Sequence, residues 1–303
     1  MHSYLISGLH VSSELELPGA TPEDAHVRPV DVSIRRSAVP MTLDGATASG
    51  PTWEMVGEMF LLRVPALARF GITAGCDIAV EIEPGATERD AASFVHGPAF
   101  GILLHQRGVL VLHGAAVAKD GRAIAICGPS GGGKSTLAAA LCGNGCSFVT
   151  DDICVVGLDE HGQPIVLPDG KQLKLWKESI DQLNLADRQG EAVRKTVEKY
   201  YIDPFDARGQ PSPLSAIYVL REARPPLKTG IGALALPDAM RMLDYEGYRP
   251  GLRAKIGQKP KRLAHTAAML GHAKVFRLVR LRGFEHLQET VAALRAHWDS
   301  LDR

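Results

Sequence analysis

The stretch "GPSGGGKST", Gly128 to Thr136, constrains the fold more than any other part of this 303-residue chain. A short β-type run, "RAIAIC", precedes it, and it continues into "STLAAALCG", which has high helix propensity and stops at "GNG", residues 143–145. A strand, a glycine-rich loop and a helix in this order form the context in which such a loop binds phosphates. The sequence therefore predicts an α/β fold built around a P-loop.

The residues of this loop have different expected roles. Its glycines let successive backbone N–H groups point inward, and the start of the helix adds the positive end of its dipole. Lys134 is expected to reach the β- and γ-phosphates as a catalytic residue, and the Ser135 hydroxyl is expected to ligate Mg²⁺. We therefore predict that the chain binds ATP and Mg²⁺. The residues predicted to contact the nucleotide are Gly128, Ser130, Gly131, Gly132, Gly133, Lys134, Ser135 and Thr136.

Two adjacent acids follow the predicted helix. Asp151 and Asp152 end a short apolar run, 17 residues after Lys134 (151 − 134), so one helix and a return strand can bring them back to the loop. One acid can then hold the metal while the other accepts a proton from the attacking hydroxyl. The alternative is a pair of surface acids in a turn or a helix cap.

His113 is a third candidate, at the end of "VLVLH" and 21 residues before Lys134 (134 − 113). The segment from residue 119 to 122, "KDGR", separates two β-type runs, and Asp-Gly tolerates the positive φ of a tight hairpin turn. The strand that carries His113 would then pair with the strand that leads into the loop. Its ring would then lie near the phosphates or the acids. The alternative is that His113 has only a structural role.

The rest of the chain divides at about residue 86. Residues 1–85 contain short alternating runs such as "DVSIRR", "FLLRV" and "CDIAVEIE", which predict a small strand-rich N-terminal domain. "TERD", residues 87–90, has a helix-start pattern, and the apolar stretch after it closes at Gly108. Residues 86–303 are predicted to form the P-loop domain. Weaker patterns predict helices near 176–185 and 261–270 and strands at 216–220 and 275–281, and Leu287, Val291, Leu294 and Trp298 predict one apolar face of a final helix.

Composition excludes several classes of protein. Lys plus Arg and Asp plus Glu both total 34, so net charge makes no case for a nucleic-acid partner. No segment reaches the ~18 uncharged apolar residues that a membrane span requires. The five cysteines show no zinc spacing, and we expect all of them to be buried thiols in a reducing compartment. We therefore predict a cytoplasmic protein without a membrane partner.

Ten basic residues and no acid lie between Arg249 and Arg282. A solvated basic face is the simplest interpretation for most of these residues. The alternative is a surface that binds phosphates or an acidic partner.

Three motifs in one order resemble the C-terminal catalytic domain of the HPr kinase/phosphorylase family. They are "LHG" (112–114), "GPSGGGKS" (128–135) and "TDD" (150–152). The resemblance covers about residues 95 to 160. It implies that Asp151 is the catalytic acid/base, that His113 is a catalytic histidine on the phosphate side, and that Asp152 is the second acid, which we assign to the metal with Ser135. The family's glycine-rich signature with its metal-binding glutamate is not recognisable, which leaves any metal role of Asp169 or Glu178 open.

The segments "GPAFGILLHQRG" and "LKLW" narrow the resemblance to HPr-kinase-like proteins found with lasso-peptide biosynthesis. We therefore predict an ATP-dependent kinase that transfers a phosphoryl group to a Ser or Thr hydroxyl of a peptide or small protein, such as a lasso precursor peptide. The alternatives are a P-loop kinase of a small metabolite and a non-catalytic ATP-binding regulator. An ABC-type ATPase is excluded because the chain lacks an LSGGQ-type signature. By analogy with HPr kinases, self-association into a homo-oligomer is expected.

Overall fold

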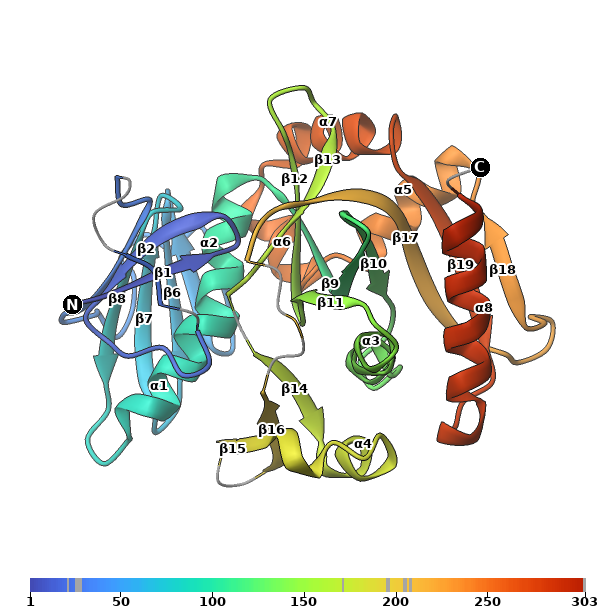
Figure 1. The fold of residues 1–303 in the computed structure, drawn as a ribbon. Coiled ribbons are helices and arrows are strands. Elements are labelled where there is room, and N and C mark those ends of the chain that lie inside the picture. The colour runs from blue at the N-terminus through green and yellow to red at the C-terminus, as the bar shows by residue number, and fades with distance from the viewer. Residues whose placement is uncertain are drawn as a thin grey trace.

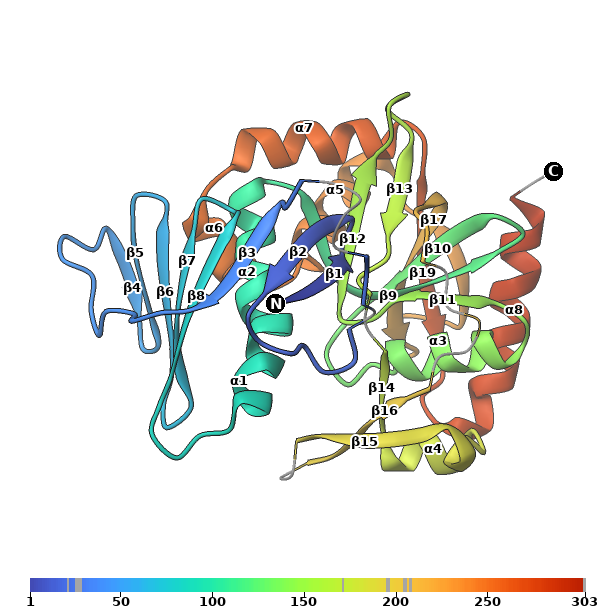
Figure 2. The same cartoon turned by 60° about the vertical axis from the view of Figure 1, so that its left-hand side comes forward.

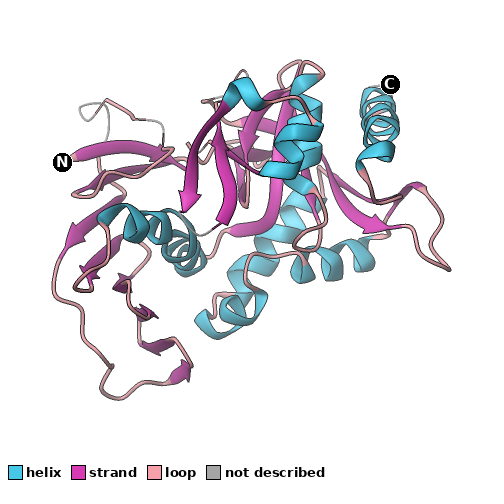
Figure 3. Ribbon diagram, turned by 90° about the horizontal axis from the view of Figure 1, so that it is seen from below, coloured by secondary structure: helices cyan, strands magenta, loops and turns pink. Residues whose placement is uncertain are grey.

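The computed structural model describes residues 1–20, 22–24, 29–170, 172–194, 197–203, 206 and 209–301. They form a mixed α/β structure with two eight-stranded sheets and one three-stranded sheet. The first sheet, drawn in blue, lies on one side of the molecule, and the second sheet lies on the other (Figures 1 and 2). Figure 3, which is coloured by secondary structure, shows that most helices lie around the second sheet.

The first sheet has the strand order β1-β2-β3-β8-β7-β6-β5-β4. Its inner face is apolar because alternate residues of each strand point to the same side, and Phe60, Phe70, Ile72 and Ile78 are fully buried there. The strand runs predicted in residues 1–85 are confirmed. The strands are β1 (His2–Ile6), β2 (Leu9–Ser13), β3 (Val32–Arg36), β4 (Ala48–Gly50), β5 (Trp53–Val56), β6 (Met59–Val64), β7 (Ala68–Thr73) and β8 (Asp77–Ile82).

A continuous helical segment connects the first sheet to the second. It comprises α1 (Glu88–Phe94), a π-helical turn (Val95–Ala99) and α2 (Phe100–Arg107). Thr87 caps it as predicted, since its hydroxyl accepts a hydrogen bond from the Asp90 amide (3.1 Å), and left-handed Gly108 ends it. Its apolar residues share one core with the first sheet. The domain division at residue 86 therefore remains a prediction.

The second sheet has the strand order β10-β9-β12-β13-β17-β19-β18, with β11 paired to β9. Because β17 pairs with both β13 and β10, five of these strands form a closed path. The predicted Asp-Gly hairpin is confirmed, with φ values of 50° and 82° at Asp120 and Gly121. The strands are β9 (Leu110–Lys119), β10 (Arg122–Cys127), β11 (Ser147–Thr150), β12 (Ile153–Leu158), β13 (Pro164–Leu167), β17 (Ser212–Glu222), β18 (Gly230–Ala233) and β19 (Lys274–Arg280).

Helices cover both faces of this sheet. On one face α3 (Lys134–Gly143) packs with α8 (Leu287–Ser300), whose four predicted apolar residues are all buried. On the other face lie α5 (Leu236–Tyr245) and α7 (Lys259–Leu270), and α6 (Pro250–Ile256) packs near α2. Short 3₁₀ turns occur at Ala186–Arg188 and Phe284–His286.

None of the helices in the described part of the chain is long and apolar enough to cross a membrane.

The prediction of a helix from residue 176 to 185 is wrong in part, because its first residue belongs to the three-stranded sheet. The helix expected near 176–185 is shorter, α4 (Lys177–Gln182), because Trp176 is extended (φ −69°, ψ 149°) and pairs with Lys199. Trp176 instead ends β14 (Leu173–Trp176), which pairs with β16 (Val197–Ile202) and through it with β15 (Gln189–Arg194). This small sheet and α4 lie beneath α3 in Figure 1.

One composition-based prediction is also corrected. Cys76 is exposed rather than buried, because it lies in the turn between β7 and β8. Most of the basic block is exposed, as expected, but Arg253 and Arg262 are buried. Arg253 donates to the Asp244 carboxylate (2.6 Å), and Arg262 donates to the Gly257 carbonyl (3.0 Å). These two cations hold α6 and α7 in place.

A buried histidine on α2 makes stability depend on pH. His105 Nε2 donates to the Tyr248 carbonyl (2.8 Å), and burial lowers the pKa of His105 to about 4, with a smaller effect from Arg253 and Arg262. Between about pH 6.5 and pH 4 the unfolded chain therefore binds a proton that the folded chain does not bind. From pH 7 to pH 5 this should remove about 2 kcal/mol from the free energy of unfolding.

Urea denaturation of the wild type and of His105→Gln at both pH values tests this prediction. Glutamine keeps a donor for the Tyr248 carbonyl but does not titrate, so the variant should lose less stability than the wild type on acidification. An equal loss in both proteins would contradict the prediction.

Candidate active site

The glycine loop runs from the end of β10 to the start of α3. Gly133 begins α3 with φ of +83°, and a Cβ there would lie 2.5 Å from Arg280 Nη2. Gly128 has φ of +149°, and a Cβ there would lie 2.9 Å from the Leu220 Cβ. Both positions therefore require glycine. The N-cap residue of α3, Gly133, has no side chain that could bond the first amides of the helix.

Lys134 is buried at the base of the loop, with 6% of its surface exposed. Its Nζ donates to the carbonyls of Gly128 (2.9 Å) and Pro129 (3.0 Å). Burial lowers the pKa of Lys134, and the negative charge of Asp151 opposes this shift. The ammonium is thus fixed inside the curve of the loop.

Ser135 joins the loop to the first acid. Its hydroxyl donates to Asp151 Oδ1 (2.8 Å), and Asp151 is buried directly after β11. Burial raises the pKa of Asp151, and Lys199 opposes this shift. The assignment of Ser135 and Asp152 to the metal stays a prediction, and in the structure the Ser135 hydroxyl contacts Asp151. Asp152, the next residue, has a left-handed φ of 73°.

Asp152 lies beside His113. Because β9 and β12 are antiparallel, with His113 opposite Ile153, the imidazole reaches the turn that carries the acids. His113 Nδ1 lies 3.1 Å from Asp152 Oδ1 and 3.3 Å from the Asp152 carbonyl. The Asp152 side chain is 45% exposed, in contrast to the buried Asp151. The two acids therefore occupy different environments.

The remaining predicted loop residues lie in two places. Ser130, Gly131 and Gly132 line a pocket on the side of the loop that faces β17 and β19. The Thr136 hydroxyl lies 3.0 Å from the Ser179 hydroxyl of α4, so it connects α3 to α4. Thr136 was predicted to contact the nucleotide, and in the structure its hydroxyl contacts the neighbouring helix α4.

Sequence reasoning missed a buried ion pair beside the loop. Arg221 Nη2 donates to Glu246 Oε1 (2.6 Å), and Glu246 is 4% exposed. The Glu246 carbonyl accepts from the His113 amide (2.9 Å). Burial lowers the pKa of Lys134, and the Glu246 charge makes a small contribution against this shift. Arg221 could have been suspected from its place at the carboxyl end of a predicted strand. Glu246 carries no such signal, because it follows α5 in an irregular segment.

Tyr248 belongs to the same irregular segment. Its amide donates to the Val111 carbonyl (2.9 Å) of β9, and its ring centroid lies 6.3 Å from that of His113. The segment from Glu246 to Tyr248 thus runs along β9 and packs beside the His113 ring.

The site suits Mg²⁺ in its donor types. Mg²⁺ is usually held by one or two carboxylates together with substrate phosphates and water. Ser135 and Asp151 offer a hydroxyl and a carboxylate at the mouth of the loop, and Asp152 follows directly. The described residues contain no cluster of three or more His, Cys, Asp or Glu that could hold a metal without such phosphates. Asp169 is fully buried, and Glu178 lies in the first turn of α4.

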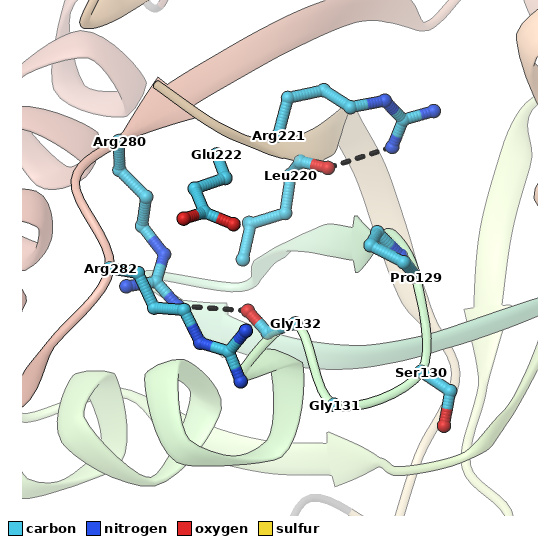
Figure 4. Close-up of a pocket in the computed structure, with 9 residues that line it drawn as sticks. All are labelled: Pro129, Ser130, Gly131, Gly132, Leu220, Arg221, Glu222, Arg280 and Arg282. Atoms are coloured by element: carbon cyan, nitrogen blue, oxygen red, sulfur yellow. Dashed lines mark hydrogen bonds between the residues drawn. The ribbon is translucent and has the colours of Figure 1, made fainter. Parts of the chain in front are cut away.

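A pocket of about 210 Å³ opens on the other side of the loop (Figure 4). Arg280 Nη2 donates to the Gly132 carbonyl (2.8 Å), and Arg282 lies beside it. Burial lowers the pKa of Arg280, as does the neighbouring charge of Arg282. The residues that line the pocket are Pro129, Ser130, Gly131, Gly132, Leu220, Arg221, Glu222, Arg280 and Arg282.

No protein-family model matches the chain, and no curated protein matches it significantly. Among solved structures, the Hpr(Ser) kinase/phosphatase from Coxiella burnetii matches with a TM-score of 0.35 and 13% sequence identity. The match covers 64% of this chain and 99% of the other.

Proposed function

We propose that the chain is an ATP-dependent kinase whose glycine loop is a P-loop, and that it transfers the γ-phosphoryl group to a Ser or Thr hydroxyl of a peptide or small protein. The hydrogen bond from Ser135 to Asp151 is the observation that carries the proposal. It joins the start of α3 to Asp151, so this carboxylate lies at the mouth of the loop near the fixed cation of Lys134, and Asp152 follows it directly.

Each residue has a chemical role in this proposal. The amides of the loop and Lys134 bind and orient the phosphates. A bound Mg²⁺ would neutralise charge on the phosphate oxygens and would be held by Ser135 and an acid. The acceptor oxygen attacks the γ-phosphorus, ADP leaves, and the hydroxyl proton passes to a carboxylate. His113 holds the side chain of Asp152 in position.

Two assignments of the acids follow from different observations. The family resemblance makes Asp151 the proton acceptor and Asp152 the metal ligand, and the raised pKa of Asp151 suits that role. The contacts favour the reverse assignment. Ser135 already bonds Asp151, and the partly exposed Asp152 is the acid that a hydroxyl on a large acceptor can reach. We adopt the assignment from the contacts, in which Asp152 accepts the proton and Asp151 binds the metal. The reverse assignment is the alternative that the experiments below test.

Incubation with γ-labelled ATP and candidate acceptors tests the function. We expect label in a peptide or small protein, at a Ser or Thr located by mass spectrometry, and a lasso precursor peptide is the first acceptor to try. Label transferred only to a small metabolite would favour the metabolite kinase. Tight ATP binding without transfer to any acceptor would favour the regulator, and either result would overturn the proposal.

A further inference from the structure

The pocket described above lies on the side of the glycine loop that faces away from the acids. The strand β10 pairs with β9 on one edge, with Cys127 opposite Gly114, and with β17 on the other edge, with Cys127 opposite Val219. The acids follow β11, which pairs with β9. The pocket instead lies against the carboxyl ends of β17 and β19. The acids and the pocket therefore flank the loop from opposite sides.

The pocket walls combine three kinds of group. Leu220 and Pro129 provide apolar surface, and Glu222 provides a carboxylate, one oxygen of which accepts from Arg224 (2.8 Å). Arg282 is exposed at the rim, and no hydrogen bond or ion pair holds its guanidinium within the described residues. In Figure 4 Glu222 lies between Leu220 and Arg280, and the Arg282 side chain is drawn beside Gly132.

We propose that this pocket binds the nucleoside end of a nucleoside triphosphate, with the ribose hydroxyls on Glu222 and the base against the Arg282 guanidinium and Leu220. The inference rests on the proposed function. If the transferred phosphate lies by Asp151 and Asp152, the other end of the nucleotide extends across the loop toward β17 and β19. The strands β10, β17 and β19 run parallel, and ligands of α/β sheets commonly bind at the carboxyl ends of parallel strands, where this pocket lies.

The lining fits a nucleoside better than a further phosphate. A carboxylate in the wall repels a phosphate but accepts hydrogen bonds from hydroxyl groups. A guanidinium plane stacks on the face of any base, so it binds without selecting one base. The pocket volume of about 210 Å³ is below the ~300–1,000 Å³ of sites that enclose a whole ligand. It suits one part of a nucleotide whose phosphates lie in the loop.

Arg280 has a positioning role in this arrangement. Its donation to the Gly132 carbonyl joins β19 to the loop, so the pocket wall and the phosphate-binding amides keep a fixed separation. Because Arg221 pairs with Glu246, Arg282 and Glu222 are the two charged side chains of the pocket left to contact the nucleoside.

Calorimetric titration with Mg²⁺ and either a non-hydrolysable ATP analogue or tripolyphosphate tests the proposal. Arg282→Lys keeps the charge but removes the stacking plane, and should weaken the analogue about fivefold or more. Glu222→Gln should weaken the analogue roughly tenfold. Neither variant should weaken tripolyphosphate, and Glu222→Gln should bind it at least as tightly as the wild type. Arg241→Ala, at an exposed arginine of α5, should change neither affinity.

The other outcomes each have one meaning. If the variants weaken both ligands equally, the pocket binds phosphate and the nucleoside assignment is wrong. Unchanged affinity for both ligands would mean that the pocket contacts neither. If the wild type binds neither ligand, the loop is not a polyphosphate site, and the proposed function fails together with this inference.

Discussion

Lys134→Ala should lose most of the affinity for Mg-ATP and almost all phosphoryl transfer. The Lys134 ammonium is fixed by two loop carbonyls at 2.9 and 3.0 Å, at the centre of the amides that would surround the phosphates. A charge-assisted hydrogen bond lost from a buried site lowers affinity by about 10-fold to 10²-fold, and the loss of transition-state charge stabilisation adds to the effect on rate.

Calorimetry with Mg-ATP and single-turnover transfer measure the two effects of this substitution. Lys228→Ala, at an exposed lysine, is the matched control and should behave as the wild type. Circular dichroism should show that the Lys134 variant is folded. An unchanged affinity for Mg-ATP in Lys134→Ala would mean that the glycine loop is not the nucleotide site.

The parts of the fold that the sequence predicted depend on interactions between residues close together in the chain. The Thr87 cap, the Asp120-Gly121 turn and the strand before the glycine loop each depend on residues within a few positions of one another. The final helix was predictable because its apolar face repeats with the helical period. In these segments the local preference and the tertiary structure agree.

Long-range partners explain the errors. Arg253 looked like part of a solvated basic block because its partner, Asp244, lies on the preceding helix and outside that block. Trp176 looked helical because its partner strand, β16, lies more than twenty residues further along the chain. The sequence carries no local signal for either pairing.

The candidate site shows the same division. The order of the motifs predicted that Ser135 and His113 would come close to the acids, and they do. Which acid each would contact depends on the backbone at Asp152, whose left-handed φ of 73° sends two adjacent side chains to different partners. Glu246 was missed because an irregular segment brings it to Arg221 from a distant part of the chain.

The two acids should respond differently to substitution by asparagine, which keeps the shape of the side chain but removes its charge. On the assignment from the contacts, Asp152→Asn removes the proton acceptor. Single-turnover transfer should fall by about 10²–10⁴, with Mg-ATP still bound and no rescue by added Mg²⁺. Asp151→Asn removes the charge beside Ser135, so it should raise the Mg²⁺ requirement and recover part of its rate at high Mg²⁺.

A Mg²⁺ titration of single-turnover transfer in both variants separates the two assignments, with Asp187→Asn, at an exposed acid, as the control. The reverse pattern, with an unrescued loss in Asp151→Asn and a metal-dependent loss in Asp152→Asn, would mean that the buried acid accepts the proton, as the family resemblance implies. In that case the bond between Ser135 and Asp151 would have to open when the nucleotide binds, because Ser135 would be needed at the metal. Full transfer activity in both variants would mean that neither carboxylate takes part in phosphoryl transfer, and the kinase proposal would lose the observation that carries it.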